Sequence, residues 1–554
     1  MLARAEVQES AYLDLTDEAR SYGAIHGNKR APPAVSRDLD EEGERFTSPP
    51  KDQKTHQDVG SIVAVLLLGE FISNADATLV MASTGQISSE FNSLQDANWL
   101  STAYTLGVCS TLPMYAKLSD ILGRTPLLLT AYFFLTFGCI ICGTAPAMWV
   151  VILGRAISGV GGAGTMVMGS VIILDIIPTK DVAQWRAYIN VAMTLGRGAG
   201  GPVGGWLTDA IGWRWLFLIQ APLIGLAALP VIFKLKIPHP LPAMTWNGLK
   251  TSIFQRIDFL GTGVLTAAVT ATVLLVDQGG KSFSWLSWLS CSLSVASVIL
   301  MASFGYIEMY IAREPIFDLR VLRRPNVLAS YLVGSLQIAA QVGIMFSVPL
   351  YFEVTKHAST VEAGAHLVPA VLGNAIGGLC AGLFARWTGR YKTLLIMGTV
   401  IASSTYMLLW LRWNGHTSFW ESLYVIPGGV GTGISSTAAF VLMTSFLELE
   451  EMPTVTGGYF LLHTFFMTVS ITGTNTILGF EFRRQLRRHI HEPGAPQIIR
   501  RAISDLHYIA HLRGYLQQMV VNCYVAALKG TYITSFVLSG VAWLLSFTVR
   551  EPCL

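Results

Sequence analysis

Two carboxylate side chains interrupt the first apolar segment of the chain, and their chemistry is suited to proton exchange. Glu70 and Asp76 flank Asn74 in this segment. Burial in an apolar environment favours the neutral form of a carboxyl group, which can then bind and release protons near neutral pH. We predict that Asp76 carries the proton and that Glu70 is the second candidate. The alternative for Glu70 is a structural contact with a neighbouring helix.

Arginines inside apolar segments form a second group of candidates. Arg155 lies within an apolar run that starts near residue 149. A charge at the centre of a bilayer costs at least about 2.5–3.5 kcal/mol, so we expect Arg155 to face a polar cavity or a carboxylate. The alternative is that its long side chain reaches the membrane surface. Arg197 interrupts a glycine-rich run and is a further candidate for the lining of a pathway.

A short charged segment occurs twice in the chain. Residues 116–124 align without gaps to 382–390, and each copy ends in Gly-Arg after an apolar run. Glycine permits a tight turn there, and Asp120 can pair with Arg124 or with nearby helix ends. An ordinary basic loop is the alternative. The predicted cytoplasmic gate consists of Asp120, Gly123, Arg124, Gly389 and Arg390.

The composition shows what kind of elements must position these residues. Of the 554 residues, 52% are hydrophobic and only 13% are charged. Soluble proteins contain about 25% charged residues, so a lipid bilayer is the expected surroundings. The net charge of +3 gives no indication of a nucleic-acid partner. We predict an all-α membrane protein of about fourteen helices, near 61–83, 97–116, 127–145, 149–174, 186–207, 214–234, 257–277, 285–311, 327–352, 362–385, 393–411, 420–446, 456–480 and 530–549.

Loop charges predict the orientation of these helices. With the N-terminus in the cytosol, most loop lysines and arginines lie on the cytoplasmic side, as is usual. The basic segment 481–529 is the exception, and we expect it to lie on the membrane surface as an amphipathic helix; the alternative is that the number of spans differs by one. The predicted organisation is a disordered cytoplasmic tail 1–58, a six-helix half 59–235, two inserted helices 236–326, a second six-helix half 327–549 that contains 481–529, and a short tail 550–554.

The charged turn and Arg155 carry a resemblance to a known family. The segment Ala116-Lys-Leu-Ser-Asp-Ile-Leu-Gly-Arg124 resembles the signature loop of the major facilitator superfamily, Gly-x-Leu-Ala-Asp-x-x-Gly-Arg-Lys, and departs from it at Ala116 and Thr125. Arg155 with Gly159 and Gly161 resembles the family motif Arg-x-x-x-Gly-x-Gly. The resemblance implies a transporter fold and links Arg155 to proton coupling.

The fifth predicted helix carries a further family pattern. The sequence Gly201-Pro-Val-Gly-Gly205 resembles the antiporter motif Gly-Pro-x-x-Gly-Gly, which is enriched in exporters. Glycines four residues apart also give a helix one smooth face for close packing. Plain packing is therefore the alternative to a role in antiport. The residues concerned are Gly196, Gly200, Gly201, Pro202, Gly204 and Gly205.

Two more segments narrow the resemblance to one branch of the family. Residues 74–80 and 212–222 resemble segments of the fourteen-span drug:proton antiporters, and Gln220 is most typical of fungal members. That branch includes multidrug and toxin efflux pumps and vacuolar basic amino-acid transporters. The resemblance implies a location in the plasma membrane or the vacuolar membrane, between which the sequence does not distinguish.

We therefore predict a proton-coupled antiporter that exports a small organic molecule from the cytosol by alternating access. The alternatives are a vacuolar basic amino-acid transporter and a substrate sensor that does not transport. An enzyme is not expected, because no catalytic arrangement is recognisable. Expected partners are the substrate, protons and the lipid bilayer, with no cofactor, no metal and a monomeric state.

Overall fold

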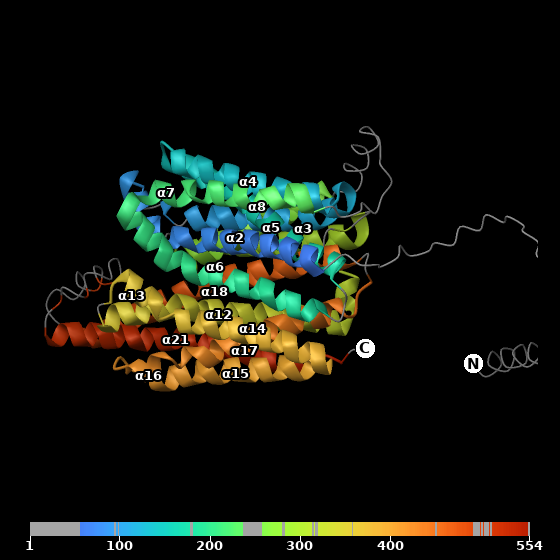
Figure 1. The fold of residues 1–554 in the computed structure, drawn as a ribbon. Coiled ribbons are helices and arrows are strands. Elements are labelled where there is room, and N and C mark those ends of the chain that lie inside the picture. The colour runs from blue at the N-terminus through green and yellow to red at the C-terminus, as the bar shows by residue number, and fades with distance from the viewer. Residues whose placement is uncertain are drawn as a thin grey trace, which may run out of the picture. The chain divides into compact units, whose positions relative to one another are not determined.

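The computed structural model describes residues 56–93, 96–97, 99–177, 181–235, 258–279, 283–312, 315, 319–356, 358–448, 451–490, 499, 502, 509, 512 and 514–551. These residues belong to one compact unit, Thr55–Leu554, and almost all of the regular structure in them is helical (Figure 1). The predicted tail 1–58 lies almost wholly outside the described residues, as does most of 550–554.

Long apolar segments account for the helices, because a backbone in lipid must satisfy its hydrogen bonds internally. Eleven helices among the described residues are long and apolar enough to cross a membrane. Together with α3, α6 and α10, they match the fourteen predicted spans. The main helices are α2 (His56–Glu90), α3 (Trp99–Leu122), α4 (Arg124–Thr144), α5 (Met148–Ile176), α6 (Val182–Ile211), α7 (Trp213–Leu218), α8 (Gln220–Lys234), α10 (Phe259–Gln278), α11 (Trp288–Tyr306), α12 (Pro325–Lys356), α13 (Thr360–Ala365), α14 (Val368–Thr388), α15 (Tyr391–Arg412), α16 (Phe419–Ser422), α17 (Val425–Thr444), α18 (Met452–His489) and α21 (Tyr515–Ser546).

The helices of residues 59–235 contact those of residues 327–549 mainly along two helix pairs. We call residues 59–235 the N-half and residues 327–549 the C-half. Helix α6 of the N-half packs on α14 of the C-half, and α3 packs on α18. In Figure 1 the N-half (blue to green) and the C-half (yellow to red) occupy separate layers, with α6 and α18 at their boundary. The inserted helix α10 packs against both α3 and α18, so it contacts both halves.

Buried side chains connect the halves at one end of the bundle. We call this end, which carries Arg124, the Arg124 end, and the opposite end the Arg214 end. One hydrophobic cluster combines Tyr115 and Leu112 of the N-half with Phe440 and Phe460 of the C-half. Near the Arg214 end, the buried clusters of the two halves are separate. This conformation is therefore closed at the Arg124 end.

The basic segment 481–529 differs from its predicted form. Helix α18 continues without a break to His489, and α21 begins at Tyr515, so both helices extend into the predicted surface segment. Four exposed arginines follow one face of the α18 extension, while Phe482 and Leu486 on the other face pack into the C-half core. The extension is amphipathic, as predicted, but it continues a spanning helix. Most of the connection between the two helices lies outside the described residues.

Candidate functional site

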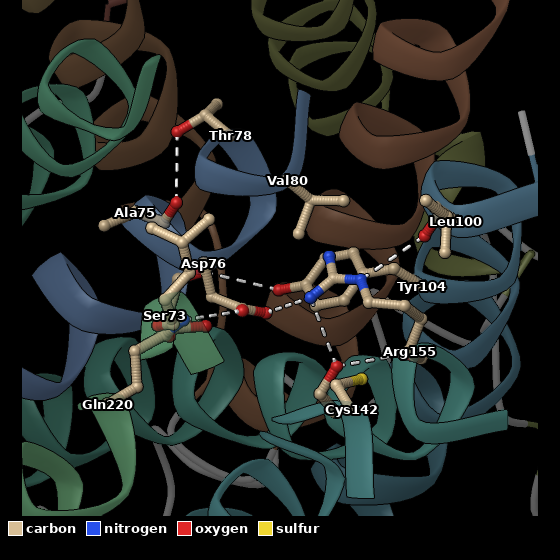
Figure 2. Close-up of polar contacts among 12 residues, drawn as sticks. Ser73, Ala75, Asp76, Thr78, Val80, Leu100, Tyr104, Cys142, Arg155 and Gln220 are labelled. Atoms are coloured by element: carbon tan, nitrogen blue, oxygen red, sulfur yellow. Dashed lines mark hydrogen bonds and ion pairs between the residues drawn. The ribbon is translucent and has the colours of Figure 1, made fainter. Parts of the chain in front are cut away.

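A buried ion pair joins two of the predicted residues. Arg155 Nη1 on α5 lies 2.7 Å from Asp76 Oδ2 on α2, and the two side chains are 1% and 0% exposed. Gln220 Nε2 on α8 donates to the other oxygen of Asp76 at 3.2 Å (Figure 2). Arg155 therefore faces a carboxylate, and its side chain does not reach the membrane surface.

The surroundings of Arg155 hold its guanidinium in place. Its Nε donates to the carbonyl oxygen of Leu100 at 3.3 Å, and its guanidinium carbon lies 4.4 Å from the centre of the Tyr104 ring. Helix α3 can approach α5 this closely because a Cβ at Gly159 would clash with the carbonyl of Tyr104. The glycine that completes the Arg-x-x-x-Gly pattern thus positions an aromatic ring over the arginine.

A second polar group connects α2 with α6. Asn74 Nδ2 donates to the carbonyl oxygen of Glu70 at 2.8 Å and to Glu70 Oε2 at 3.4 Å. Arg197 Nε donates to Asn74 Oδ1 at 2.9 Å. Glu70 is buried, and its Oε1 has no hydrogen-bond partner among the described residues. The structure thus brings Glu70 and Arg197 together through Asn74, without a direct ion pair.

The glycine face of α6 makes this arrangement possible. A Cβ at Gly196 would clash with the carbonyl of Phe71, and one at Gly204 would lie 2.7 Å from the carbonyl oxygen of Leu79. Helices α2 and α6 are therefore packed backbone to backbone, as the spacing of the glycines predicts. Gly201 is different, because nothing lies within 4 Å of the position of its Cβ. Pro202 lies inside the helix, and Gly205 is partly exposed.

The charged turn at the end of α3 is assembled as the sequence suggests. Arg124 Nη1 lies 2.6 Å from Asp120 Oδ1, and its Nε lies 2.8 Å from Asp175 Oδ2 at the end of α5. Gly123 adopts a φ of 88°, a backbone conformation that glycine accommodates without strain. Arg124, at the start of α4, thus links the ends of α3 and α5 through its two ion pairs.

The second copy of the turn differs from the first. Gly389 has a φ of 65° and ends α14, as its glycine suggests. The side chain of Arg390 is exposed and has no ion pair among the described residues. Arg386, one turn earlier, instead contacts Asp181 of the N-half at 2.8 Å. The contact between halves is therefore made by Arg386, which stands in the repeat where the first copy has Asp120.

Comparison with known proteins assigns the family. The family model for the Major Facilitator Superfamily matches residues 66–470. The chain belongs to this superfamily. It is 32% identical to the vacuolar membrane amino acid uptake transporter fnx2 of Schizosaccharomyces pombe, over 86% of this chain and 81% of that one. It is 29% identical to the multidrug resistance protein fnx1 of the same yeast, over 89% and 92%.

A solved structure supports the fold. The major facilitator proton:xylose symporter XylE shares 13% identity and aligns with a TM-score of 0.55, over 89% of this chain and 95% of that chain. Members of the superfamily are transporters that work within a membrane. This chain is thus a major facilitator protein with several membrane-spanning helices, and its relatives include fungal transporters.

One charged residue of this major facilitator protein was assigned wrongly from sequence. Arg186 is the first residue of the predicted span 186–207, and the positive-inside pattern counts it among the basic residues of the preceding cytoplasmic loop. The structure instead buries it within α6, where Nη1 donates to Ser170 of α5 at 2.8 Å. Its guanidinium carbon lies 4.0 Å from the centre of the Phe440 ring and 5.2 Å from that of Phe460. The signal in the sequence is the position of Arg186 in the first turns of a helix that carries a second arginine, Arg197, in its glycine-rich run.

Uncharged polar residues at the interface between halves were also missed. Asn190 and Thr194 on α6 both donate to Asn374 Oδ1 on α14, at 2.9 and 3.0 Å. Within the C-half, His463 Nδ1 on α18 lies 3.3 Å from Ser335 Oγ of α12. Hydroxyl and amide side chains are common in membrane helices, so nothing in the sequence distinguishes these from residues that only pack.

Proposed function

We propose that the protein is a proton-coupled antiporter that moves a small organic molecule out of the cytosol. The observation that carries this proposal is the buried ion pair between Asp76 and Arg155. A buried ion pair is weak evidence for stability, because the cost of desolvating two charges can exceed their attraction. A pair of this kind within membrane-spanning helices is instead typical of ion and proton pathways.

The geometry suggests how a proton would act. Protonation of Asp76 removes the negative charge that faces Arg155 Nη1 at 2.7 Å. Arg155 then keeps its contacts with the carbonyl of Leu100 and the ring of Tyr104 on α3, and a longer one of 5.9 Å to the Phe217 ring on α7. Protonation thus weakens the link between α2 and α5, and loss of the proton restores it. In this proposal the change couples proton binding to the movement of the halves.

The closed end of the structure faces the cytosol in this proposal, as the loop charges suggest. Asp120 and Arg124 hold helix ends together there, and the rings around Arg186 close the gap between the halves. The described conformation would then be closed toward the cytosol. Opening of this end would admit substrate, and opening of the Arg214 end would release it.

An amino-acid transporter of the vacuolar membrane is the second candidate. It is favoured by the 32% identity to fnx2, whose name describes amino acid uptake at that membrane. The two candidates differ in substrate and in membrane, while both move the substrate away from the cytosol. Fluorescent tagging of the protein in a fungal cell would distinguish the vacuolar membrane from the plasma membrane.

Transport by the purified protein in liposomes tests the proposed function. Vesicles with an imposed pH gradient are offered basic amino acids, drugs and fungal metabolites. We expect gradient-driven flux of at least one compound, and we expect Asp76→Asn to abolish its dependence on the gradient. The matched control is Asp209→Asn, since Asp209 is an exposed carboxylate at the end of α6. Binding without flux would favour the sensor alternative, and unchanged coupling in Asp76→Asn would exclude Asp76 as the proton carrier.

A further inference from the structure

Arg197 presents the outer edge of its guanidinium without a protein partner. Its hydrogen bond from Nε to Asn74 Oδ1 is the one that it makes within the described part of the chain. The two terminal nitrogens therefore lack protein acceptors there, and neither belongs to the buried atoms that are left unsatisfied. Because the side chain is partly exposed, these nitrogens reach accessible space.

The arginine is held firmly in this orientation. Asn74 accepts from Arg197 while its own amide nitrogen donates to Glu70, and this fixes which way the Asn74 oxygen points. The residues on either side of Arg197 are glycines in close contact. Gly196 packs on α2, and a Cβ at Gly198 would lie 2.5 Å from a methyl of Val371 on α14. Arg197 is thus positioned where the N-half meets the C-half.

The charges around Arg197 do not balance. Asp76 and Arg155 neutralise each other as a close pair. That leaves one carboxylate, Glu70, and two guanidinium groups, Arg186 and Arg197, which act electrostatically on one another. No carboxylate of the described residues lies within ion-pair distance of Arg186 or Arg197. The site therefore carries an excess positive charge even when Glu70 is ionised.

An excess of buried positive charge is costly unless an anion compensates it. A guanidinium group offers two parallel N–H donors that match the two oxygens of a carboxylate. Arg197 is bonded through Nε, so its two terminal nitrogens still offer this pair of parallel donors. A second cation at this site, by contrast, would increase the imbalance.

We propose that Arg197 binds the carboxylate, or a similar anionic group, of the transported molecule. This inference rests on the proposed transport function and specifies its substrate class. Amino acids qualify through their α-carboxylate, and acidic metabolites qualify through theirs. Lipophilic cations without an acidic group do not. Arg197 is then a substrate-binding residue, and Asn74 and Glu70 are the residues that position it.

The test compares each acid with its amide, which differs only in the anionic group. The probes are L-lysine and L-lysinamide, L-histidine and L-histidinamide, L-leucine and L-leucinamide, and benzoate and benzamide. Exchange is measured by counterflow in liposomes without a pH gradient, and binding is measured by thermal stabilisation of the purified protein. We expect the wild-type protein to prefer an acid to its amide by about tenfold or more, the range for hydrogen bonds to charged groups.

Substitution of Arg197 should remove this preference. In Arg197→Gln the ratio of acid to amide should fall to about one, and Arg197→Lys should keep part of it through its point charge. Arg412→Gln is the control, because Arg412 is an exposed arginine paired with Glu421. If Arg197→Gln does not fold, Arg197→Lys still reports on the ratio.

Three outcomes would overturn the inference: no acid of the panel binds, acid and amide bind equally, or Arg197→Gln keeps the wild-type ratio. The last outcome would mean that a group other than Arg197 recognises the anionic group. Failure of the proposed function is distinguishable, because it appears as acid-selective binding or exchange without any response to a pH gradient.

Discussion

The guanidinium carbon of Arg186 in the N-half lies 4.0 Å from the centre of the Phe440 ring in the C-half. Arg186 is buried, and a second ring from α18 lies on the same group. A cation over an aromatic face is stabilised by about 0.5–2 kcal/mol, more where water is excluded. The contact exists only when the two halves are together at the Arg124 end.

Removal of this ring should therefore favour opening at the Arg124 end. We expect Phe440→Leu to increase the open population about two- to thirtyfold, which corresponds to the range of cation–π energies. Spin labels at positions 122 and 388 would measure the separation of the halves by electron–electron double resonance. Phe446→Leu is the control, because Phe446 is partly buried and meets an arginine only through its main-chain carbonyl, which accepts from Arg324 at 3.1 Å and is kept in the variant. An unchanged distance distribution in Phe440→Leu would contradict the prediction.

Replacing one member of the Asp76–Arg155 pair should lower the free energy of unfolding far more than replacing both. Arg155→Met leaves the carboxylate buried and uncompensated, which destabilises a protein by about 3–5 kcal/mol. The double variant Asp76→Asn/Arg155→Met should recover much of this loss. Thermal unfolding in detergent, analysed as a double-mutant cycle, would measure the coupling. Additive effects of the two single variants would show that the pair does not act as a unit.

Neighbouring glycines of α6 should respond differently to the same substitution. A Cβ at Gly200 would clash with Oγ1 of Thr78, whereas the space at Gly201 is open. Gly200→Ala should destabilise by about 1–3 kcal/mol, as overpacking does. Gly201→Ala should be neutral or stabilising by up to about 1 kcal/mol, because alanine is the better helix former. Unfolding temperatures of the two variants give the comparison, and equal effects would exclude close packing as the role of Gly200.

The Arg214 end should weaken in acid. Hydrogen bonds from Trp213 and Arg214 hold the pKa of Glu90 below its ordinary value. A carboxyl group with a lowered folded-state pKa contributes stability above its unfolded pKa, and this is lost as the pH falls through the folded pKa. The ion pair between Glu90 and Arg214 is exposed, so it contributes within about 0–1 kcal/mol to the free energy of unfolding.

Hydrogen–deuterium exchange of residues 84–92 would follow this change. Below the ordinary pKa of a glutamate, exchange corrected for its intrinsic pH dependence should accelerate in the wild-type protein. Glu90→Gln should show little such acceleration. The same acceleration in both proteins would assign it to another group.

The sequence predicted the helices well, because each must be long and apolar to cross a bilayer. It also identified Asp76 and Arg155, because a charge in an apolar run is conspicuous. It did not pair them, since their side chains come from helices far apart in the sequence. Arg186 was misplaced for a related reason: near the edge of a span, burial between two rings and exposure in a loop leave the same sequence pattern.

The internal repeat predicted side-chain partners less reliably than the charges inside apolar segments predicted functional residues. The repeat correctly indicated glycine turns at Gly123 and Gly389, since backbone conformation is a local property. It gave no indication of the partners of Arg390, because a partner depends on the surrounding helices. The sequence analysis expected a helix in the basic segment but missed that it continues α18, because its arginines indicate the end of a spanning segment although they are good helix formers.

The length of α18 has a mechanical consequence. Its 38 residues form a rod of about 57 Å at 1.5 Å per residue, almost twice the thickness of the hydrocarbon layer. A rod of that length magnifies small rotations: a tilt of about 5° about its Met452 end displaces the far tip by about 5 Å. A rearrangement between the halves would thus move the arginine-bearing end of α18, which extends beyond the hydrocarbon layer.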